Sequence, residues 1–121
     1  SVASRGLGDV YKRQVMAWVF LLFAGLLEVV WAFLMKASAG FTRPGPTFGM
    51  IVFMIGSFGL LSISMKTLPL GTAYAIWTGI GAVGAFAVGA VFLGEPLTPL
   101  RIAGVTLVAS GLIVLKLASS H

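Results

Sequence analysis

The sequence predicts an all-α membrane protein with four transmembrane helices. The 121 residues are 59% hydrophobic and 9% charged, with a mean hydropathy of +1.07, whereas a soluble domain has about 25% charged residues. So few charges cannot cover the surface of a water-soluble fold. A helix that crosses a bilayer needs about 20 residues, so this length allows four or five such helices and little else. Four apolar segments separated by turns rich in glycine and proline follow one another along the chain.

The turns between the apolar segments set the expected helix ends. Gly40 is the expected stop of the first helix, and two prolines follow it as helix breakers. Before the last segment, Thr98 is placed to cap a helix and Pro99 fits its first turn. The expected helices run over about 17–35, 47–65, 72–93 and 100–117.

The first fifteen residues differ from the rest. Residues 1–15 are polar and contain glycine, and they lack the apolar core of a signal peptide. The apolar sequence begins directly at Met16. We hypothesise that residues 1–15 are a non-native prefix and that residues 16–121 form the membrane subunit. N-terminal sequencing of the protein made from its native gene tests this, since a chain beginning with Ser1 would contradict it.

Several chemistries are excluded by composition. The chain has no cysteine, and its single histidine is His121. Zinc sites built from Cys and His, thiolate nucleophiles and histidine triads are therefore excluded. The basic residues are scattered singly, which is unlike a nucleic-acid patch. We expect no enzyme, no metal, no cofactor and no nucleic-acid partner.

The basic residues give the chain almost no preferred orientation. Counted from Met16, one side of the membrane carries Lys66 and Lys116, and the other carries Lys36, Arg43 and Arg101. Cytoplasmic loops normally hold a clear excess of Lys and Arg. The split allows one weakly specified orientation, or copies inserted both ways that pair as an antiparallel dimer. Such a homodimer would also supply an inverted repeat that a four-helix chain lacks.

Glu28 is the one acid inside an expected membrane segment. An ionised carboxylate at a helix centre costs about 2.5–3.5 kcal/mol on insertion scales. No Lys, Arg or His lies within the membrane segments to pair with it. Proton carriage and cation binding are the roles left open, beside a purely structural hydrogen bond to a neighbouring helix.

Aromatic and hydroxyl side chains provide further candidates for a site. Gly25 and Trp31 lie three residues on either side of Glu28 and share its helix face. Tyr74 and Trp77 form a second pair at the same spacing, and Ser57 is the central hydroxyl of the second segment. The spacing of the aromatic pair is explained equally well by helix packing. The serine is explained equally well by a hydrogen bond to the backbone, so neither feature by itself requires a binding site.

Glycines mark places of close approach or bending. Gly79 and Gly81 follow Trp77 in mid-helix, where two glycines make a hinge plausible. Gly104 and Gly111 lie seven residues apart on one face of the last segment, which has no polar residue suited to a cation site. A dimer contact is the better role for that helix.

The chain resembles the small multidrug resistance family, and specifically its guanidinium-exporter branch. The phrases that carry the resemblance are AGLLEVVWAFLMKASAGFT, KTLPLGTAYAIWTGIGAVG and FLGEPLTPLRIAGVTLVASGLIVLK, and it extends from Met16 to about Ser120. It implies four helices per subunit, an antiparallel dual-topology homodimer in the bacterial inner membrane, and export of guanidinium and small guanidinyl compounds coupled to protons.

The resemblance also implies roles for residues. Glu28 matches the glutamate that binds either protons or substrate. The other matches are the side chains lining the site, the glycine hinge and the dimer motif of the last helix, namely Trp31, Ser57, Tyr74, Trp77, Gly79, Gly81, Gly104 and Gly111, and Gly25 is added to the lining from its place on the Glu28 face. Trp31 separates the guanidinium branch from the quaternary-ammonium branch, which resembles EVIG with a small residue there. A quaternary-ammonium or multidrug exporter and a non-transporting membrane subunit remain the alternatives.

Overall fold

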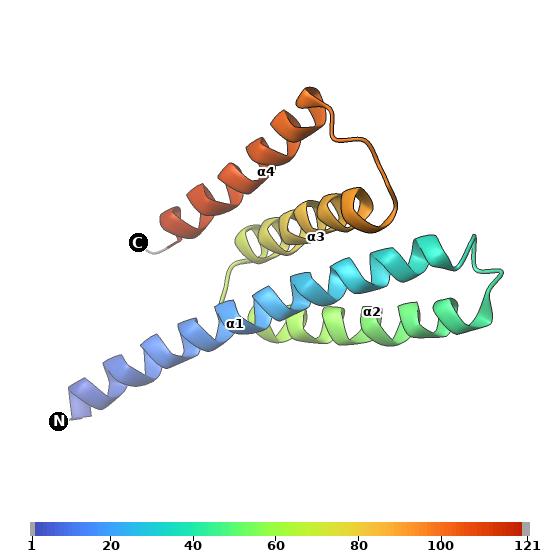
Figure 1. The fold of residues 1–121 in the computed structure, drawn as a ribbon. Helices are drawn as coiled ribbons and strands as arrows, with labels where there is room; N and C mark the ends of the chain where they lie inside the picture. Colours follow the sequence, from blue (N-terminus) through green and yellow to red (C-terminus); the bar gives the residue numbers. More distant parts are fainter. Residues whose placement is uncertain (1, 120–121) are drawn as a thin grey trace.

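Four helices make up the structure, a computed structural model that describes residues 2–119. They are α1 (Val2–Ala37), α2 (Pro44–Ser64), α3 (Leu70–Phe92) and α4 (Pro99–Ala118), as Figure 1 shows. Each contains a stretch long and apolar enough to cross a membrane. The prediction of an all-helical chain with four membrane-spanning segments is confirmed.

Helix α1 is the element that differs most from expectation. It begins at Val2, whereas the expected first helix began at about residue 17. No proline interrupts residues 2–16, so nothing in the backbone ends the helix there. At 36 residues α1 is about 54 Å long, well beyond the roughly 30 Å of a bilayer's hydrocarbon core. Its N-terminal part projects past the other helices (Figure 1).

The other helix ends lie within three residues of the expected ones, and the local signals explain them. Helix α1 ends at Ala37, and Ala39, Gly40 and Phe41 then take the left-handed conformation (φ +50°, +75° and +67°) that turns the chain out of the helix. Helix α2 begins at Pro44 itself, because a proline at the first helical position has no N–H to leave unpaired. The Thr98 side chain accepts the N–H of Arg101 at 3.2 Å, so the predicted cap of α4 is confirmed.

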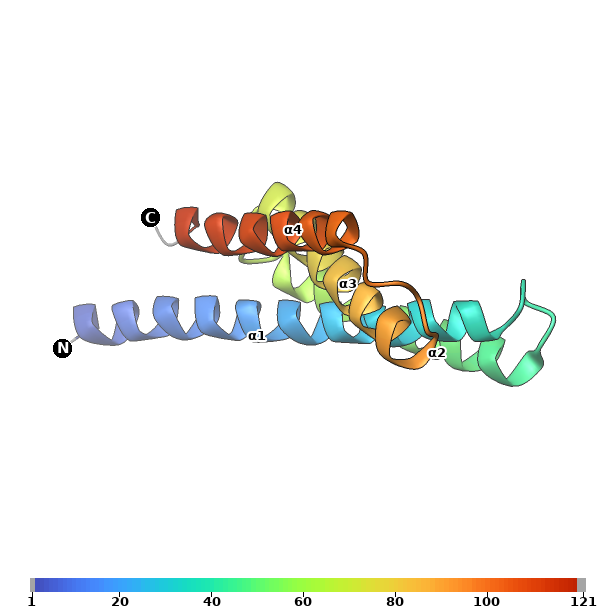
Figure 2. The same cartoon turned by 45° about the horizontal axis from the view of Figure 1, so that its top comes forward.

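Helix α3 is the centre of the packing. It contacts α1, α2 and α4, and α1 and α2 pack along each other as a hairpin. Figure 2 shows α3 crossing between α4 and the α1–α2 pair. The buried cluster joins the first three helices and the turn before α3, through Ala17, Leu21, Ala24, Leu61, Leu68, Ala73, Ile76 and Trp77.

Helix α4 is the least covered element. Within residues 2–119 it packs along α3 and touches α1 where the Lys116 ammonium lies 4.4 Å from the centre of the Trp18 ring, and none of its residues is buried. Its contact with α3 is a stripe that includes the half-buried Leu112 and Leu115. Most of the other large apolar side chains of α4 are exposed, with Leu107 74% exposed.

Candidate functional site

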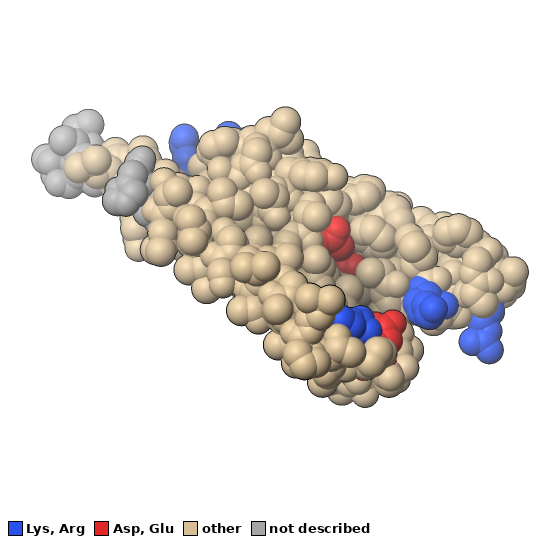
Figure 3. Space-filling view, turned by 90° about the horizontal axis from the view of Figure 1, so that it is seen from above, with Lys and Arg blue, Asp and Glu red and all other residues tan. Residues whose placement is uncertain are grey.

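The Glu28 carboxylate lies between α1 and α3, in the apolar part of the molecule. Its Oε1 is buried and has no hydrogen-bond partner among the described residues. It lies against Gly81 of α3, where a Cβ would overlap the carboxylate. On the face drawn in Figure 3, one group of acidic atoms lies in the middle of the molecule among uncharged atoms, and a second group lies beside basic atoms. The fold thus places a carboxylate in a helix that is apolar enough to span a membrane, and no side chain among residues 2–119 bonds to its buried oxygen.

Ser57 connects the three packed helices through two buried hydrogen bonds. Its hydroxyl donates to the Ala24 carbonyl oxygen of α1 at 2.6 Å. The Ser57 hydroxyl oxygen in turn accepts the Nε1–H of Trp77 of α3 at 2.9 Å. A buried hydrogen bond of this kind contributes about 0.5–1.5 kcal/mol net, and an orphaned partner costs more. Ser57 therefore fixes the position of the Trp77 ring beside α1.

Four aromatic rings form a continuous row across the same region. Trp31 meets Phe58 edge to face at 6.3 Å between centroids, and Phe58 meets Trp77 edge to face at 5.6 Å. Tyr74 continues the row with its ring 5.6 Å from that of Trp77. Such contacts prefer edge-to-face geometry, because the ring edge is positive and the face negative. The predicted aromatic residues of α1 and α3 thus belong to one cluster.

Phe58 is the member of this cluster that the sequence did not single out. It joins Trp31 of α1 to Trp77 of α3. A phenylalanine in an uncharged membrane segment looks like any other apolar residue. Its position directly after Ser57 is the one signal in the sequence that could have indicated it.

The Trp31 indole has an unused donor. Its Nε1 is buried and has no hydrogen-bond partner among the described residues. Trp31 lies three residues after Glu28, on the same face of α1. A buried polar atom left unpaired in a native fold calls for a ligand, a second chain or water as its partner. Glu28 and Trp31 present one unpaired acceptor and one unpaired donor on this face.

The remaining predicted glycines lie at helix contacts. Gly25 lies against the Ile80 side chain of α3, and Gly79 lies against the Leu112 side chain of α4. Both permit close approach of neighbouring helices, and α3 runs unbroken through Gly79 and Gly81. Gly104 and Gly111 of α4 have open space where a Cβ would stand. Both are free of side-chain contacts at this position, and Gly111 lines a cavity between α3 and α4.

The arrangement is suited to binding an organic cation. The unpaired carboxylate can accept N–H groups, and the row of aromatic faces can attract a positive charge. Within residues 2–119, no three His, Cys, Asp or Glu side chains form a group that could hold a metal ion. The chemistry available is that of carboxylate, indole, phenol and hydroxyl.

Comparison with known proteins gives a consistent result. The family described as "Small Multidrug Resistance protein" matches residues 16–108. A guanidinium exporter of Citrobacter freundii is 53% identical over 104 residues, which cover 86% of this chain and 99% of the relative. Guanidinium exporters of Salmonella typhimurium strain LT2 and Escherichia coli strain K12 are 54% and 52% identical over the same lengths.

These matches confirm the resemblance drawn from the sequence. The relatives are named as exporters and not as enzymes. Together with the four apolar helices, the match fits a multi-pass protein of the bacterial inner membrane. The chain belongs to the small multidrug resistance family.

Proposed function

We propose that this protein exports guanidinium and small guanidinyl compounds across the inner membrane in exchange for protons, and that the two compete for Glu28. The observation that carries the proposal is the buried Glu28 carboxylate, which has no partner among the described residues. The named activity of relatives at 52–54% identity supports the choice of guanidinium as substrate.

Guanidinium fits the chemistry of this site. It is planar and permanently charged, and it presents its N–H donors in a fork that matches the two oxygens of a carboxylate. The rings of Trp31, Phe58, Trp77 and Tyr74 lie in one row across the helices. Aromatic faces add attraction for a desolvated cation, about 2 kcal/mol in favourable cases.

Substrate export is coupled to proton entry because Glu28 binds only one of the two at a time. A carboxylate that holds a proton no longer attracts a cation, and one paired with guanidinium no longer takes a proton. Guanidinium from the cytoplasm binds the deprotonated site, and protons arriving from the opposite side displace it. If the site opens to one side at a time, each outward step of substrate requires an inward step of protons.

We further propose that the working unit is an antiparallel homodimer in the bilayer. Helix α4 has no buried residue within the described chain, and a Cβ added at Gly104 or Gly111 would meet open space. Small residues of this kind let two membrane helices approach closely. In this arrangement the two α4 helices contact each other, and two Glu28 carboxylates face one cavity together with Trp31, Ser57, Tyr74, Trp77 and Gly25.

Gly79 and Gly81 are the proposed hinge of α3. Two mid-helix glycines weaken a helix by about 1 kcal/mol each relative to alanine. Gly79 contacts α4 through Leu112, and Gly81 contacts Glu28 of α1. Bending at this point would therefore move the α4 contact relative to the carboxylate, which is the motion that alternating access requires.

Substrate preference tests the proposed function most simply. Uptake of guanidinium and of tetramethylammonium is measured in proteoliposomes under the same proton gradient. We expect guanidinium to be transported and tetramethylammonium to be excluded, because the latter has no N–H donors for the Glu28 carboxylate. Tetramethylammonium transport at a comparable rate would favour a quaternary-ammonium exporter. If neither cation is transported and neither causes protons to move, the result would favour a non-transporting subunit.

Orientation is tested with single cysteines, since the chain has none of its own. Thr42 and Thr67 lie in turns at opposite ends of the helices. In a chain beginning at Met16, we expect a cysteine at either position to be labelled from outside in about half of the copies, because two basic residues oppose three. Including residues 1–15 changes the count to five against three and should shift the fraction. Labelling of one position only would contradict dual topology.

A further inference from the structure

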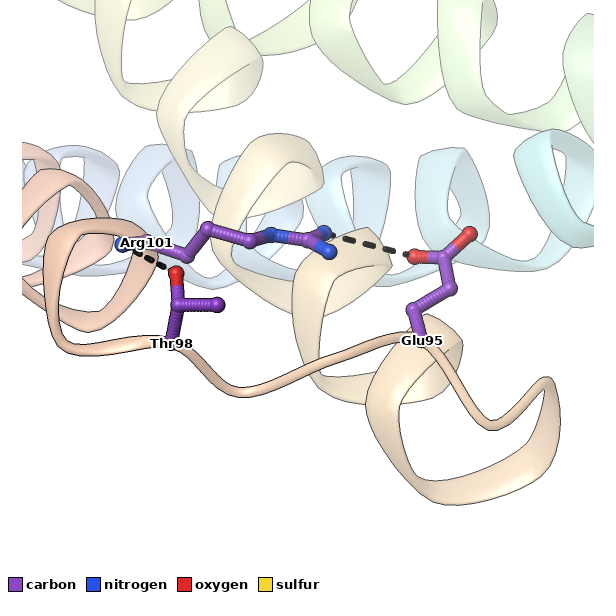
Figure 4. A network of polar contacts seen from close by, with 3 residues as sticks. All are labelled: Glu95, Thr98 and Arg101. Atoms are coloured by element: carbon purple, nitrogen blue, oxygen red, sulfur yellow. Dashed lines mark hydrogen bonds and ion pairs between the residues drawn. The ribbon is translucent and has the colours of Figure 1, made fainter.

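A second carboxylate, Glu95, already holds a guanidinium group, and that group belongs to the chain itself. Glu95 lies in the turn between α3 and α4, and its Oε1 is 3.6 Å from Nη2 of Arg101. Figure 4 shows the two side chains reaching toward each other across the turn, with Thr98 below the Arg101 backbone. The backbone N–H of Arg101 donates to the Thr98 hydroxyl, and this bond fixes the position of the Arg101 backbone in the first turn of α4.

An aromatic ring and a glycine complete the surroundings of this pair. The guanidinium carbon of Arg101 lies 5.3 Å from the centre of the Phe86 ring of α3. The Glu95 carboxylate lies against Gly89, where a Cβ would overlap it, and the Glu95 N–H donates to the Gly89 carbonyl oxygen at 3.0 Å. Carboxylate and aromatic face are the same two groups that a free guanidinium ion needs.

This pair lies on the wall of a cavity that is also lined by the residues next in sequence to Glu28 and Gly81. The cavity has a volume of about 370 Å³ and runs between α1 and α3. Val29 and Ala82 line it, and they are next in sequence to Glu28 and to the Gly81 that Glu28 contacts. Phe86, Glu95 and Arg101 line the same cavity.

We propose that Glu95 and Phe86 form an outlying guanidinium site on the wall of this cavity, kept closed by the side chain of Arg101, and that transported guanidinium displaces Arg101 there before or after binding Glu28. The choice of guanidinium rests on the proposed function. The role of the site is to hold substrate at the end of the helices, and Arg101 acts as a tethered substitute for it.

The Glu95–Arg101 pair is loose enough to exchange. A distance of 3.6 Å exceeds that of a hydrogen bond, and both side chains are more than a third exposed. Exposed pairs of this kind contribute about 0.2–1 kcal/mol. A group tethered by a short linker acts at an effective concentration of the order of millimolar. Free guanidinium at millimolar concentration can therefore compete with Arg101.

The experiment measures binding of radiolabelled guanidinium by equilibrium dialysis, with the full chain in lipid nanodiscs. All variants carry Glu28→Gln, so the Glu28 site does not contribute to the measured binding. The result therefore tests the Glu95 site independently of whether the proposed function is correct. We expect saturable millimolar binding when Arg101→Met is added, because the substitution opens the Glu95–Phe86 site. Adding Glu95→Gln as well should abolish that binding.

Lys36→Met is the matched control. Lys36 lines the same cavity, so its substitution removes one positive charge from the same space without opening the Glu95 site. We expect Glu28→Gln with Lys36→Met to bind no guanidinium in the millimolar range. Equal binding in the Lys36 and Arg101 variants would mean that net charge alone attracts the cation, and it would overturn the proposal. Absence of binding in the Arg101 variant would overturn it too.

A second measurement retains Arg101 and does not depend on the folding of its variants. With Glu28 intact, Glu95→Gln should raise the half-saturating guanidinium concentration of transport about two- to fourfold, the factor that a half-exposed ion pair is worth. The maximal rate should stay nearly constant, because Glu28 is unchanged. An unchanged half-saturating concentration, or a loss of maximal rate alone, would contradict a substrate-holding role for Glu95.

Discussion

Replacing Glu28 with glutamine is expected to abolish proton-coupled guanidinium transport. Glutamine keeps nearly the same shape, but it carries no charge and exchanges no proton. Two hydrogen bonds from a charged donor to a carboxylate are worth about 1.5–3 kcal/mol each. Their loss lowers guanidinium binding about a hundredfold or more. The measurement is uptake of radiolabelled guanidinium into proteoliposomes with a proton gradient.

Glu95→Gln is the control for this substitution. It removes the same charge and leaves the same amide, but in the turn before α4 rather than between α1 and α3. We expect uptake at saturating guanidinium to remain close to that of the unchanged chain. Coupled uptake that persists in the Glu28→Gln chain would show that another group binds both proton and substrate.

Replacing Gly81 with alanine is expected to have the second largest effect. The added methyl group would occupy the place of the Glu28 carboxylate. The end of a glutamate side chain is flexible, so the carboxylate moves and the helices stay. A displacement of about 1 Å at a reacting group can cost on the order of a hundredfold. We expect guanidinium uptake to fall at least about tenfold, with little change in the temperature of unfolding.

Gly84→Ala is the matched control, because Gly84 lies three residues further along α3 in the same contact with α1. Its added methyl group would overlap Val29 instead of Glu28. A branched valine on a helix has little freedom to move, so this variant should lose more stability and less transport than Gly81→Ala. Thermal unfolding in detergent and uptake in proteoliposomes measure the two effects. Equal losses of transport would contradict a specific role of Gly81 in placing the carboxylate.

The helix ends could be predicted because their signals are local. Gly40 lies in the left-handed turn, residues 39–41, that follows the end of α1, and the Thr98 cap forms within its own turn. The continuation of α1 through residues 2–16 could not be predicted from an apolar period, because that segment has none. The absence of a helix breaker is a weaker signal than the presence of one.

Only part of the candidate site could be predicted from the sequence. Glu28 is conspicuous because charge is scarce, so its isolation could be read directly from the sequence. The contact of its carboxylate with Gly81 joins two residues that are 53 positions apart in the chain and lie on different helices. The hydrogen bond between Trp77 and Ser57 and the bridging ring of Phe58 are also contacts between helices. No spacing along one helix predicts such contacts, because they depend on how α1, α2 and α3 cross.

Guanidinium-driven proton movement is the most direct test of the central claim, competition of substrate and proton for Glu28. Proteoliposomes containing the protein and an internal pH indicator are exposed to an outward or inward guanidinium gradient without any initial pH gradient. Competition for one carboxylate predicts that protons move opposite to guanidinium, that the direction reverses with the gradient, and that Glu28→Gln abolishes the signal. Guanidinium that crosses the membrane with no accompanying proton movement would contradict it.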